Sequence, residues 1–367
     1  MLFTVSTIKD SPKNVRFFVE ANLASGVDHM FVFLDAPAQP GQGAVFRFLK
    51  SHPHVSVIRT GQAWWEGRRP ARLNVRQRIN ANWVRTLLEP YEWAEWLFHV
   101  DGDEVVQIDR ATLDAAPAHA HTVWLQPWEA VSRLDPDGRP TQFKRLLSEE
   151  ELNLLHVLGT LQVPSNQHYF HGHVMGKVGV RPASGVAMAL HGSISPTRQE
   201  VPRHAGDRLA VLHYDAISGR EFVRKWEALG TAGPLRFRPS RMPSAMALTH
   251  LITSDLEPEV RLKYLERIYE LTIADDVDTL ADLGLLVQVD PLTSGAQPAA
   301  FPPGAREALA ARREEMSTHD KRGYYVPDPK ERFVDRVRRR IRRSLGRREA
   351  MLDVDPSGDG DLSSDGV

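Results

Sequence analysis

Residues 95–109, EWLFHVDGDEVVQID, contain an apolar run that leads directly into three carboxylates and then resumes. The run WLFHV has the length and composition of a buried strand. Asp101, Asp103 and Glu104 follow it, and the pair VV then restores the apolar character. A surface turn rarely separates two such runs, so we expect these acids to lie at the edge of a core.

The residues before this stretch alternate between strand-like and helix-like segments. We predict strands over 2–8, 29–34, 54–60 and 96–100, and helices over 13–25, 44–50 and 74–88. This alternation is typical of an α/β fold with a doubly wound, mostly parallel sheet. Ligands of such sheets bind outside the carboxyl ends of the strands. Asp10, Asp35 and Asp101 each follow a predicted strand, which places them along that edge.

The pattern is less regular after residue 110. We predict strands over 122–128, 177–180 and 208–214, and a helix over 219–229 that a capping box of Ser218 and Glu221 opens. We expect a catalytic domain over 1–230, with halves at 1–110 and 111–230. A helical extension over 231–287 and a linker over 288–304 are expected next. The remaining expected parts are a helical basic segment over 305–351 and a disordered tail over 352–367.

Composition excludes several classes of protein. The 367 residues carry a net charge of −1, so no overall field attracts nucleic acid. The absence of cysteine excludes a disulfide scaffold and a cysteine nucleophile, and it fits a reducing compartment. The first residues lack the pattern of a signal peptide, and no apolar run reaches the ~20 residues of a membrane span. We therefore expect a cytoplasmic protein.

The C-terminal region contains a strongly basic stretch, ERFVDRVRRRIRRSLGRR, at 331–348. Its apolar residues recur at helical spacing. A basic helix of this kind is most often a solvated surface, and its apolar stripe also permits peripheral contact with the inner face of a membrane. The segment DPSGDGDLSSDG at 355–366 lacks the closing Glu of a calcium loop, and we reject that interpretation.

The Asp-Gly-Asp sequence is suited to a hard divalent cation. Side chains alternate along a strand, so Asp101 and Asp103 are expected on the same side. Two neighbouring carboxylates repel each other unless a cation lies between them. Mg²⁺ or Mn²⁺ takes oxygen ligands and often bridges to phosphates. An isolated sequence of this kind is more often a solvated acidic turn, but the apolar runs around it favour a site.

Four segments together resemble the family 2-like group of A-type nucleotide-sugar glycosyltransferases. They are TVSTIKDSPKNVRFFVEANLASGVDHMFVFLD (4–35), AEWLFHVDGDEVV (94–106), GKVGVRP (176–182) and LHYDAISGREFVRKW (212–226). They occur in the family's order over about residues 1–230. The resemblance implies the A-type fold, with an acceptor-side half and C-terminal helices, and a hexosyltransferase type of activity.

The resemblance also implies roles for individual residues. Those expected beside the nucleotide sugar are Thr7, Lys9, Asp10, Asp35, Arg76, Gln77 and Asp101. Those expected to hold Mn²⁺ or Mg²⁺ are Asp101, Asp103 and His213. The sequence departs from the family at Lys9-Asp10, where Asn-Glu is usual, and in the loop DAPAQPGQG at 35–43, which leaves the nucleotide preference open.

The catalytic base is a separate question, because it must take a proton from the acceptor hydroxyl. We rank His191 first, although a structural histidine is the commoner role for such a residue, and Asp215 and Glu129 are rivals. The histidines of HYFHGH (168–173) have spacings that permit zinc, but an acceptor-facing loop explains them as well.

The sequence as a whole predicts a metal-dependent, inverting glycosyltransferase. Its donor would be a nucleoside-diphosphate sugar, with UDP favoured, and its acceptor a saccharide or a lipid-linked sugar. The alternatives are a nucleotidyltransferase, which would need a glycine-rich phosphate loop absent from TIKDSPKN, and a non-catalytic nucleotide-sugar-binding protein.

Overall fold

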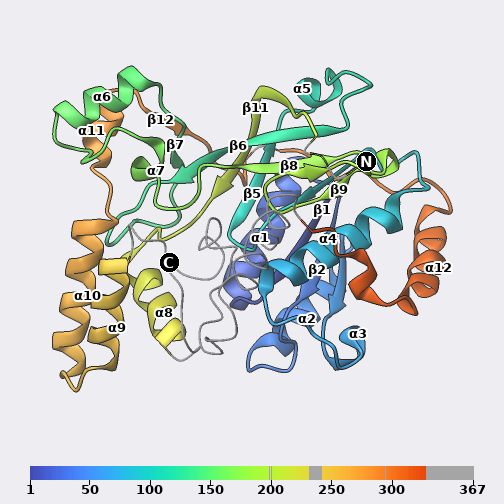
Figure 1. Cartoon of the computed structure of the whole chain (residues 1–367), viewed down its shortest axis with the longest axis horizontal. Coiled ribbons are helices and arrows are strands. Elements are labelled where there is room, and N and C mark those ends of the chain that lie inside the picture. The colour runs from blue at the N-terminus through green and yellow to red at the C-terminus, as the bar shows by residue number, and fades with distance from the viewer. Residues whose placement is uncertain (198, 200, 231–241, 294, 328–367) are drawn as a thin grey trace, which may run out of the picture. The chain divides into compact units, whose positions relative to one another are not determined.

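The computed structural model describes residues 1–327 except 198, 200, 231–241 and 294 (Figure 1). The chain forms two compact units. Within the described residues, unit 1 comprises Met1–Gln126, Met175–Val211 and 290–327, and unit 2 comprises Pro127–Val174 and Leu212–Val289. The predicted basic helix at 331–348 and the predicted tail at 352–367 lie outside the described residues. No helix among the described residues is both long and apolar enough to cross a bilayer.

Four parallel strands form the centre of unit 1. In spatial order they are β3 (Val55–Arg59), β2 (His29–Leu34), β1 (Leu2–Ile8) and β4 (Trp96–His99). Helices follow them in the chain: α1 (Pro12–Ala24), α2 (Gln42–Ser51), the short α3 (Gln62–Trp65) and α4 (Leu73–Leu88) (Figure 1). Every strand and helix predicted within the first hundred residues is present, with ends that agree to within two residues.

Alternation along the strands divides the apolar side chains of unit 1 between two cores. Met30, Val32 and Leu34 of β2 pack with Phe18 of α1 and Leu49 of α2. Their neighbours Phe31 and Phe33 pack in a second core with Trp83 and Leu87 of α4. Because adjacent side chains of a strand point to opposite faces, helices cover both faces of this sheet. The prediction of a doubly wound, mostly parallel α/β sheet is therefore confirmed.

The sheet of unit 1 continues with antiparallel strands. β8 (Lys177–Val180) pairs with β4, and β6 (Thr122–Ala130) pairs with β8. β5 (Glu104–Ile108), which follows the acidic stretch, pairs with β11 (His204–His213). The smaller elements are α5 (Arg110–Asp114), the 3-10 helix η1 (Pro182–Ser184), and the paired strands β9 (Ala187–Met188) and β10 (Ser193–Ile194).

The predicted linker at 288–304 lies along unit 1 as an irregular segment after Gln288. The Oγ atom of Ser25 donates to the carbonyl oxygen of Pro291, and the backbone N–H of Ala299 donates to Oδ1 of Asp28 at 2.9 Å. α12 (Ala305–Ser317) and η3 (Lys321–Tyr324) follow. Met316 of α12 is buried in the same core as Trp83.

Unit 2 combines helices with a small antiparallel sheet. Its helices are α6 (Glu149–Val157), α7 (Asn166–Tyr169), α8 (Gly219–Gly230), α9 (Met242–Thr253), α10 (Pro258–Thr272) and α11 (Val277–Asp282). β7 (Gln142–Lys144) pairs with the last residues of β6 and with β12 (Leu286–Gln288). Ser218 accepts from the backbone N–H of Glu221 at 3.2 Å, so the predicted N-terminal cap of α8 is present.

Candidate functional site

Three polar side chains of α4, which we call the α4 polar row, each bind the carboxyl end of a different parallel strand in unit 1. The pairs are Asn80 with Thr7 of β1, Arg76 with Asp35 after β2, and Gln77 with Asp101 after β4. All six residues are buried. α4 therefore places buried polar side chains at three strand ends, where parallel α/β sheets bind their ligands.

Asp35 is held by two arginines. Nε and Nη2 of Arg76 donate to its two carboxylate oxygens at 3.0 and 2.7 Å, and Nη2 of the more exposed Arg69 donates at 2.8 Å. Nη1 of Arg76 also donates to the carbonyl oxygens of Pro70 and Ala71. Such a two-pronged pair fixes both side chains in one geometry. Arg76 thus contacts Asp35, and its predicted contact with a nucleotide stays a prediction.

The acidic stretch forms a turn between β4 and β5. The backbone N–H of Glu104 donates to the carbonyl oxygen of Asp101 at 3.1 Å, and Oε2 of Glu104 accepts from the N–H of Asp101 at 2.8 Å. Because the chain turns here, the strand alternation that we used to place Asp101 and Asp103 on one side does not apply. Gly102 allows this turn to pass close to Ile8, whose Cγ2 would lie 3.2 Å from an added Cβ.

Lys177 is a site residue that the sequence analysis missed. Its Nζ donates to Oδ2 of Asp101 and lies 3.3 Å from Oε2 of Glu104, while Nε2 of Gln77 donates to Oδ1 of Asp101 at 2.6 Å. The side chains of Lys177 and Glu104 are fully buried. We call these four residues the Lys177 cluster. The sequence signal for Lys177 was its place in GKVGVRP, one of the four segments that carry the family resemblance.

The residues present do not fit a metal held jointly by Asp101, Asp103 and His213. Both carboxylate oxygens of Asp101 already accept hydrogen bonds from Gln77 and Lys177. Among the described residues, no group of three acidic or histidine side chains is arranged to bind a metal ion. Binding of Mn²⁺ or Mg²⁺ therefore stays a prediction of the sequence, and the positive charge beside Asp101 comes from lysine.

Two histidines lie beside the Lys177 cluster. Nδ1 of His191 donates to the carbonyl oxygen of Gly176 at 2.9 Å. Since a carbonyl oxygen only accepts, this bond fixes the neutral tautomer in which Nε2 is the basic nitrogen. His99, at the end of β4, is buried, and burial lowers its pKa to about 4, so it stays neutral at pH 7.

The first strand ends in a short polar turn. Asp10 accepts from the backbone N–H of Ser11 at 2.6 Å and from the side chain of Asn14 at 3.1 Å. Ser11 in turn caps α1 by accepting from the N–H of Asn14. Lys9 is exposed. The turn contains no glycine.

Unit 1 also contains an arginine-lined pocket of about 820 Å³. Its lining includes Arg68, Arg69 and Arg322, the acid Asp320, which lies 3.4 Å from Arg68, and the apolar or aromatic residues Val75, Ile79 and Tyr325. Arg69 connects the pocket to the end of β2, because the same side chain pairs with Asp35. Guanidinium groups bind phosphate and carboxylate through paired hydrogen bonds, so this pocket is suited to an anion with an apolar or aromatic portion.

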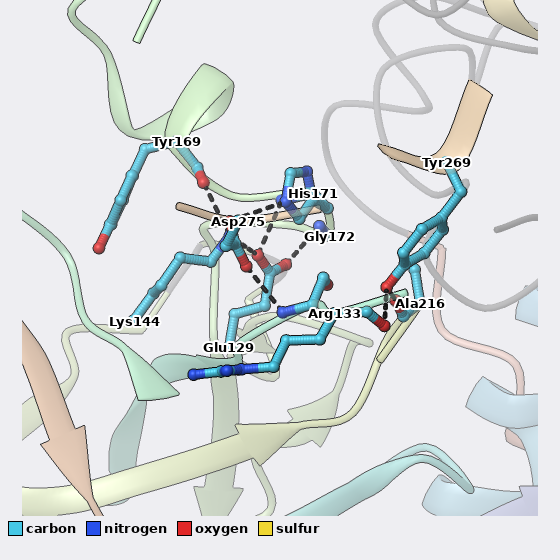
Figure 2. A network of polar contacts seen from close by, with 10 residues as sticks. Glu129, Arg133, Lys144, Tyr169, His171, Gly172, Ala216, Tyr269 and Asp275 are labelled. Carbon is cyan, nitrogen blue, oxygen red and sulfur yellow. Dashed lines mark hydrogen bonds and ion pairs between the residues drawn. The ribbon is translucent and has the colours of Figure 1, made fainter. Parts of the chain in front are cut away.

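The remaining candidates lie in unit 2, around the buried residues Lys144, Glu129, Asp275 and the adjoining His171, which we call the Lys144 cluster. Nζ of Lys144 lies 2.9 Å from Glu129 and 2.8 Å from Asp275, and Nε2 of His171 donates to Asp275 at 3.1 Å (Figure 2). Glu129 also accepts from the backbone N–H groups of His171 and Gly172. This carboxylate holds the HYFHGH loop and is poorly suited to act as a base.

The other histidines and acids of unit 2 have structural contacts. The rings of His173 and His213 stack with centroids 5.4 Å apart. Asp215 is buried and accepts from Nζ of Lys225 at 3.0 Å. His213 as a metal ligand and Asp215 as a base stay untested predictions.

Comparisons with known proteins were made for both sequence and structure. No family model and no curated protein matches the sequence. Solved structures with some similarity include HddC from Yersinia pseudotuberculosis, with 10% identity, coverage of 58% of this chain and 93% of that chain, and a TM-score of 0.30. A putative glucose-1-phosphate thymidylyltransferase from Bacillus anthracis, in complex with a sucrose, has 7% identity, coverage of 50% and 72%, and a TM-score of 0.26.

A third neighbour is the galactosyltransferase LgtC in complex with donor and acceptor sugar analogues, with 12% identity, coverage of 50% and 58%, and a TM-score of 0.21. The neighbours thus include both nucleotidyltransferases and glycosyltransferases. At these TM-scores the similarity assigns no activity to this chain, and the function is inferred from the chemistry of the site.

Proposed function

We propose that the chain is a glycosyltransferase that moves a sugar from a nucleoside-diphosphate donor, with UDP favoured, to a saccharide or lipid-linked acceptor. The α4 polar row is the observation that carries this proposal. Burying polar side chains costs free energy unless each is hydrogen-bonded, and the row meets this condition, since each of its three side chains binds a strand-end partner. Its benefit is a rigid polar edge at the strand ends, which orients groups for a polar ligand.

The arginine-lined pocket supports an anionic donor. Three arginines and one acid, Asp320, line this space together with the apolar residues Val75 and Ile79. A nucleotide has the same two parts, since its phosphates are anionic and its base is largely apolar on its faces. Arg69 joins this pocket to Asp35, which the family resemblance places beside the base or ribose.

His191 is the base that this arrangement supports. Its Nδ1 is occupied by the Gly176 carbonyl, so Nε2 is the nitrogen able to take the proton of an acceptor hydroxyl. In the proposed reaction the acceptor oxygen forms a bond to the anomeric carbon, the bond from that carbon to the diphosphate oxygen breaks, and the proton passes to His191. One displacement of this kind inverts the anomeric centre.

The turn between β1 and α1 supports this proposal over the nucleotidyltransferase alternative. That turn is Lys9-Asp10-Ser11, in which Asp10 accepts from the backbone N–H of Ser11 and the hydroxyl of Ser11 caps α1. A loop that wraps a triphosphate instead presents several backbone N–H groups and relies on glycine for the close approach. The observed turn offers neither feature.

The first test is ligand-induced stabilisation. A ligand that binds the folded state raises its melting temperature, so UDP and UDP-sugars should raise that temperature in a thermal-shift screen of nucleoside diphosphates. Arg322→Ala should weaken the shift by about 10-fold or more in apparent affinity, as for the loss of a charge-assisted hydrogen bond. Arg16→Ala, at an exposed arginine of α1, is the matched control and should leave the shift unchanged.

The second test identifies the reaction from its products. A glycosyltransferase releases a nucleoside diphosphate from the nucleotide sugar, whereas a nucleotidyltransferase releases pyrophosphate from a nucleoside triphosphate and a sugar phosphate. His191→Gln should abolish diphosphate release while leaving the thermal shift in place. Absence of a shift with every nucleotide, or release of pyrophosphate, contradicts the proposal, and a shift without turnover on any sugar acceptor identifies a binding protein.

A further inference from the structure

Lys177 occupies an unusual position for a lysine. Its side chain has no exposed surface, and its ammonium lies between the carboxylates of Asp101 and Glu104. Lysine is almost never fully buried unless it is paired, because removing an ammonium from water is costly. The polar surroundings of Nζ therefore determine what this residue does.

Each oxygen of the Asp101 carboxylate accepts a hydrogen bond from a different element. Gln77 donates to Oδ1 from α4, and Lys177 donates to Oδ2 from β8. Glu104 binds the backbone N–H of Asp101 with Oε2, the same atom that faces Lys177. One positive charge thus serves two carboxylates.

A divalent ion and this ammonium compete for the same place. Both would lie within about 4 Å of the Asp101 carboxylate, where two positive charges repel each other strongly in a buried environment. Of the two histidines beside the cluster, His99 has its pKa lowered by burial and adds no charge at pH 7, and His191 donates from Nδ1 to the carbonyl oxygen of Gly176. A divalent ion at Asp101 would have to displace Lys177 from Oδ2, which would leave the buried ammonium only Glu104 as a charged partner in the cluster.

We infer that Lys177 is the resident cation of this site: its ammonium holds Asp101 and Glu104 in the arrangement that a divalent ion would otherwise impose, and donor binding at this edge needs no added metal. The second half of the inference rests on the proposed function, and the first half does not. Lys177 acts through Asp101 and is therefore a positioning residue.

Metal binding without nucleotide tests the first half. Mn²⁺ is titrated into the full chain and followed by isothermal calorimetry and by electron paramagnetic resonance of the free ion. The natural chain should show no Mn²⁺ binding that depends on Asp101. Lys177→Met removes the ammonium and should bind Mn²⁺ at least 10-fold more tightly, with a melting temperature that rises when Mn²⁺ is added.

Three further variants control this result. Lys177→Arg keeps a positive charge and should behave as the natural chain. Asp101→Asn added to Lys177→Met should remove the gained affinity. Should Lys177→Met fail to fold, Lys177→Met with Glu104→Gln removes one charge of each sign, preserves the net charge of the cluster, and should still bind Mn²⁺ more tightly than the natural chain. The inference would be overturned if the natural chain bound Mn²⁺ and Asp101→Asn abolished that binding. It would also be overturned if neither Lys177→Met nor Lys177→Met with Glu104→Gln bound Mn²⁺ more tightly than the natural chain.

Donor binding in a chelator tests the second half. With EDTA present, a UDP-sugar should raise the melting temperature of the natural chain as much as it does with Mn²⁺. A shift that appears only with Mn²⁺ would overturn this half and support the metal dependence predicted from the sequence. A shift absent under both conditions would instead contradict the proposed function, and the Mn²⁺ titrations would still decide the role of Lys177.

Discussion

Arg76 and Asp35 form a two-pronged ion pair in which Nε and Nη2 of the arginine meet the two carboxylate oxygens at 3.0 and 2.7 Å. Both side chains are more than nine-tenths buried. Arg69 reaches the same carboxylate from the surface with one hydrogen bond and 43% exposure. The two arginines therefore offer a matched comparison between a buried and an exposed partner of one acid.

We expect Arg76→Met to lower the free energy of unfolding by roughly 3–5 kcal/mol, because it leaves the buried charge of Asp35 without its main partner. Arg69→Met should cost no more than about 1 kcal/mol, since water screens an exposed pair. Urea unfolding monitored by circular dichroism measures both. Equal costs for the two variants would show that Asp35 does not depend on its buried partner.

The Lys144 cluster predicts how unit 2 responds to acid. Burial acts to raise the pKa of Asp275, but the charges of Lys144 and His171 lower it by more. The resulting pKa lies well below the usual range of an aspartate. Burial opposes Lys144 in the same way at Glu129, whose pKa is also lowered. Carboxylates with lowered pKa values stabilise the folded state above their unfolded pKa, near pH 4, and this stabilisation is lost as the pH falls below it.

We therefore expect Asp275→Asn to make stability less dependent on pH between about pH 4.5 and pH 2, although the variant is less stable than the natural chain at pH 7. Denaturant midpoints measured across this range give the comparison. Asp282→Asn, at an exposed acid of α11, is the control and should keep the slope of the natural chain. An unchanged slope in Asp275→Asn would mean that the carboxylate is not charged in the folded protein.

His29 makes the stability of unit 1 depend on pH, in a higher range than the Lys144 cluster does for unit 2. Burial, followed by the charge of Arg306, lowers its pKa from 6.5 to about 3. The unfolded chain binds a proton near pH 6.5 that the folded chain does not. Stability from this residue is therefore complete above pH 6.5 and declines as the pH falls toward 3.

The expected loss is several kcal/mol, at about 1.4 kcal/mol for each unit of pKa shift. His29→Phe should flatten the stability profile between pH 6.5 and pH 4, since phenylalanine fits among the surrounding rings of Phe3, Phe31 and Phe301. His250→Gln, at an exposed position of α9, should leave the profile as it is. A profile unaltered by His29→Phe would place the acid sensitivity elsewhere.

Local sequence patterns were sufficient to predict the parallel sheet. β1 is rich in β-branched residues and β2 is a nearly continuous apolar run, and every residue of both is buried, as expected for strands covered on both faces. α1 ends at Ala24, with Ser25 as its C-terminal cap. Gly26 follows with a φ of 106°, a conformation that glycine adopts readily. Such signals lie within a few residues of each other, so they can be read without knowledge of the tertiary structure.

The partners within the site could not be predicted in the same way. Lys177 and Asp101 are 76 residues apart, and no spacing rule connects them. The turn at 101–104 depends on Glu104 binding the N–H of Asp101, a contact that the pattern of apolar residues does not indicate. Arg76 and Gln77 were predicted as site residues from the resemblance, but their buried carboxylate partners became visible only in the structure.

Gly179 of β8 gives the last prediction. A Cβ added there would lie 2.3 Å from the ring of Phe98, and that ring is fully buried in the core of unit 1. Because a packed ring cannot move aside without disturbing its neighbours, Gly179→Ala should destabilise the chain by about 1–3 kcal/mol. β8 also carries Lys177, so the displacement should reach the Lys177 cluster and weaken the thermal shift by a UDP-sugar. Gly192→Ala is the control, because nothing lies within 4 Å of its added Cβ. Equal melting temperatures for the two variants would show that Phe98 is less constrained than its packing indicates.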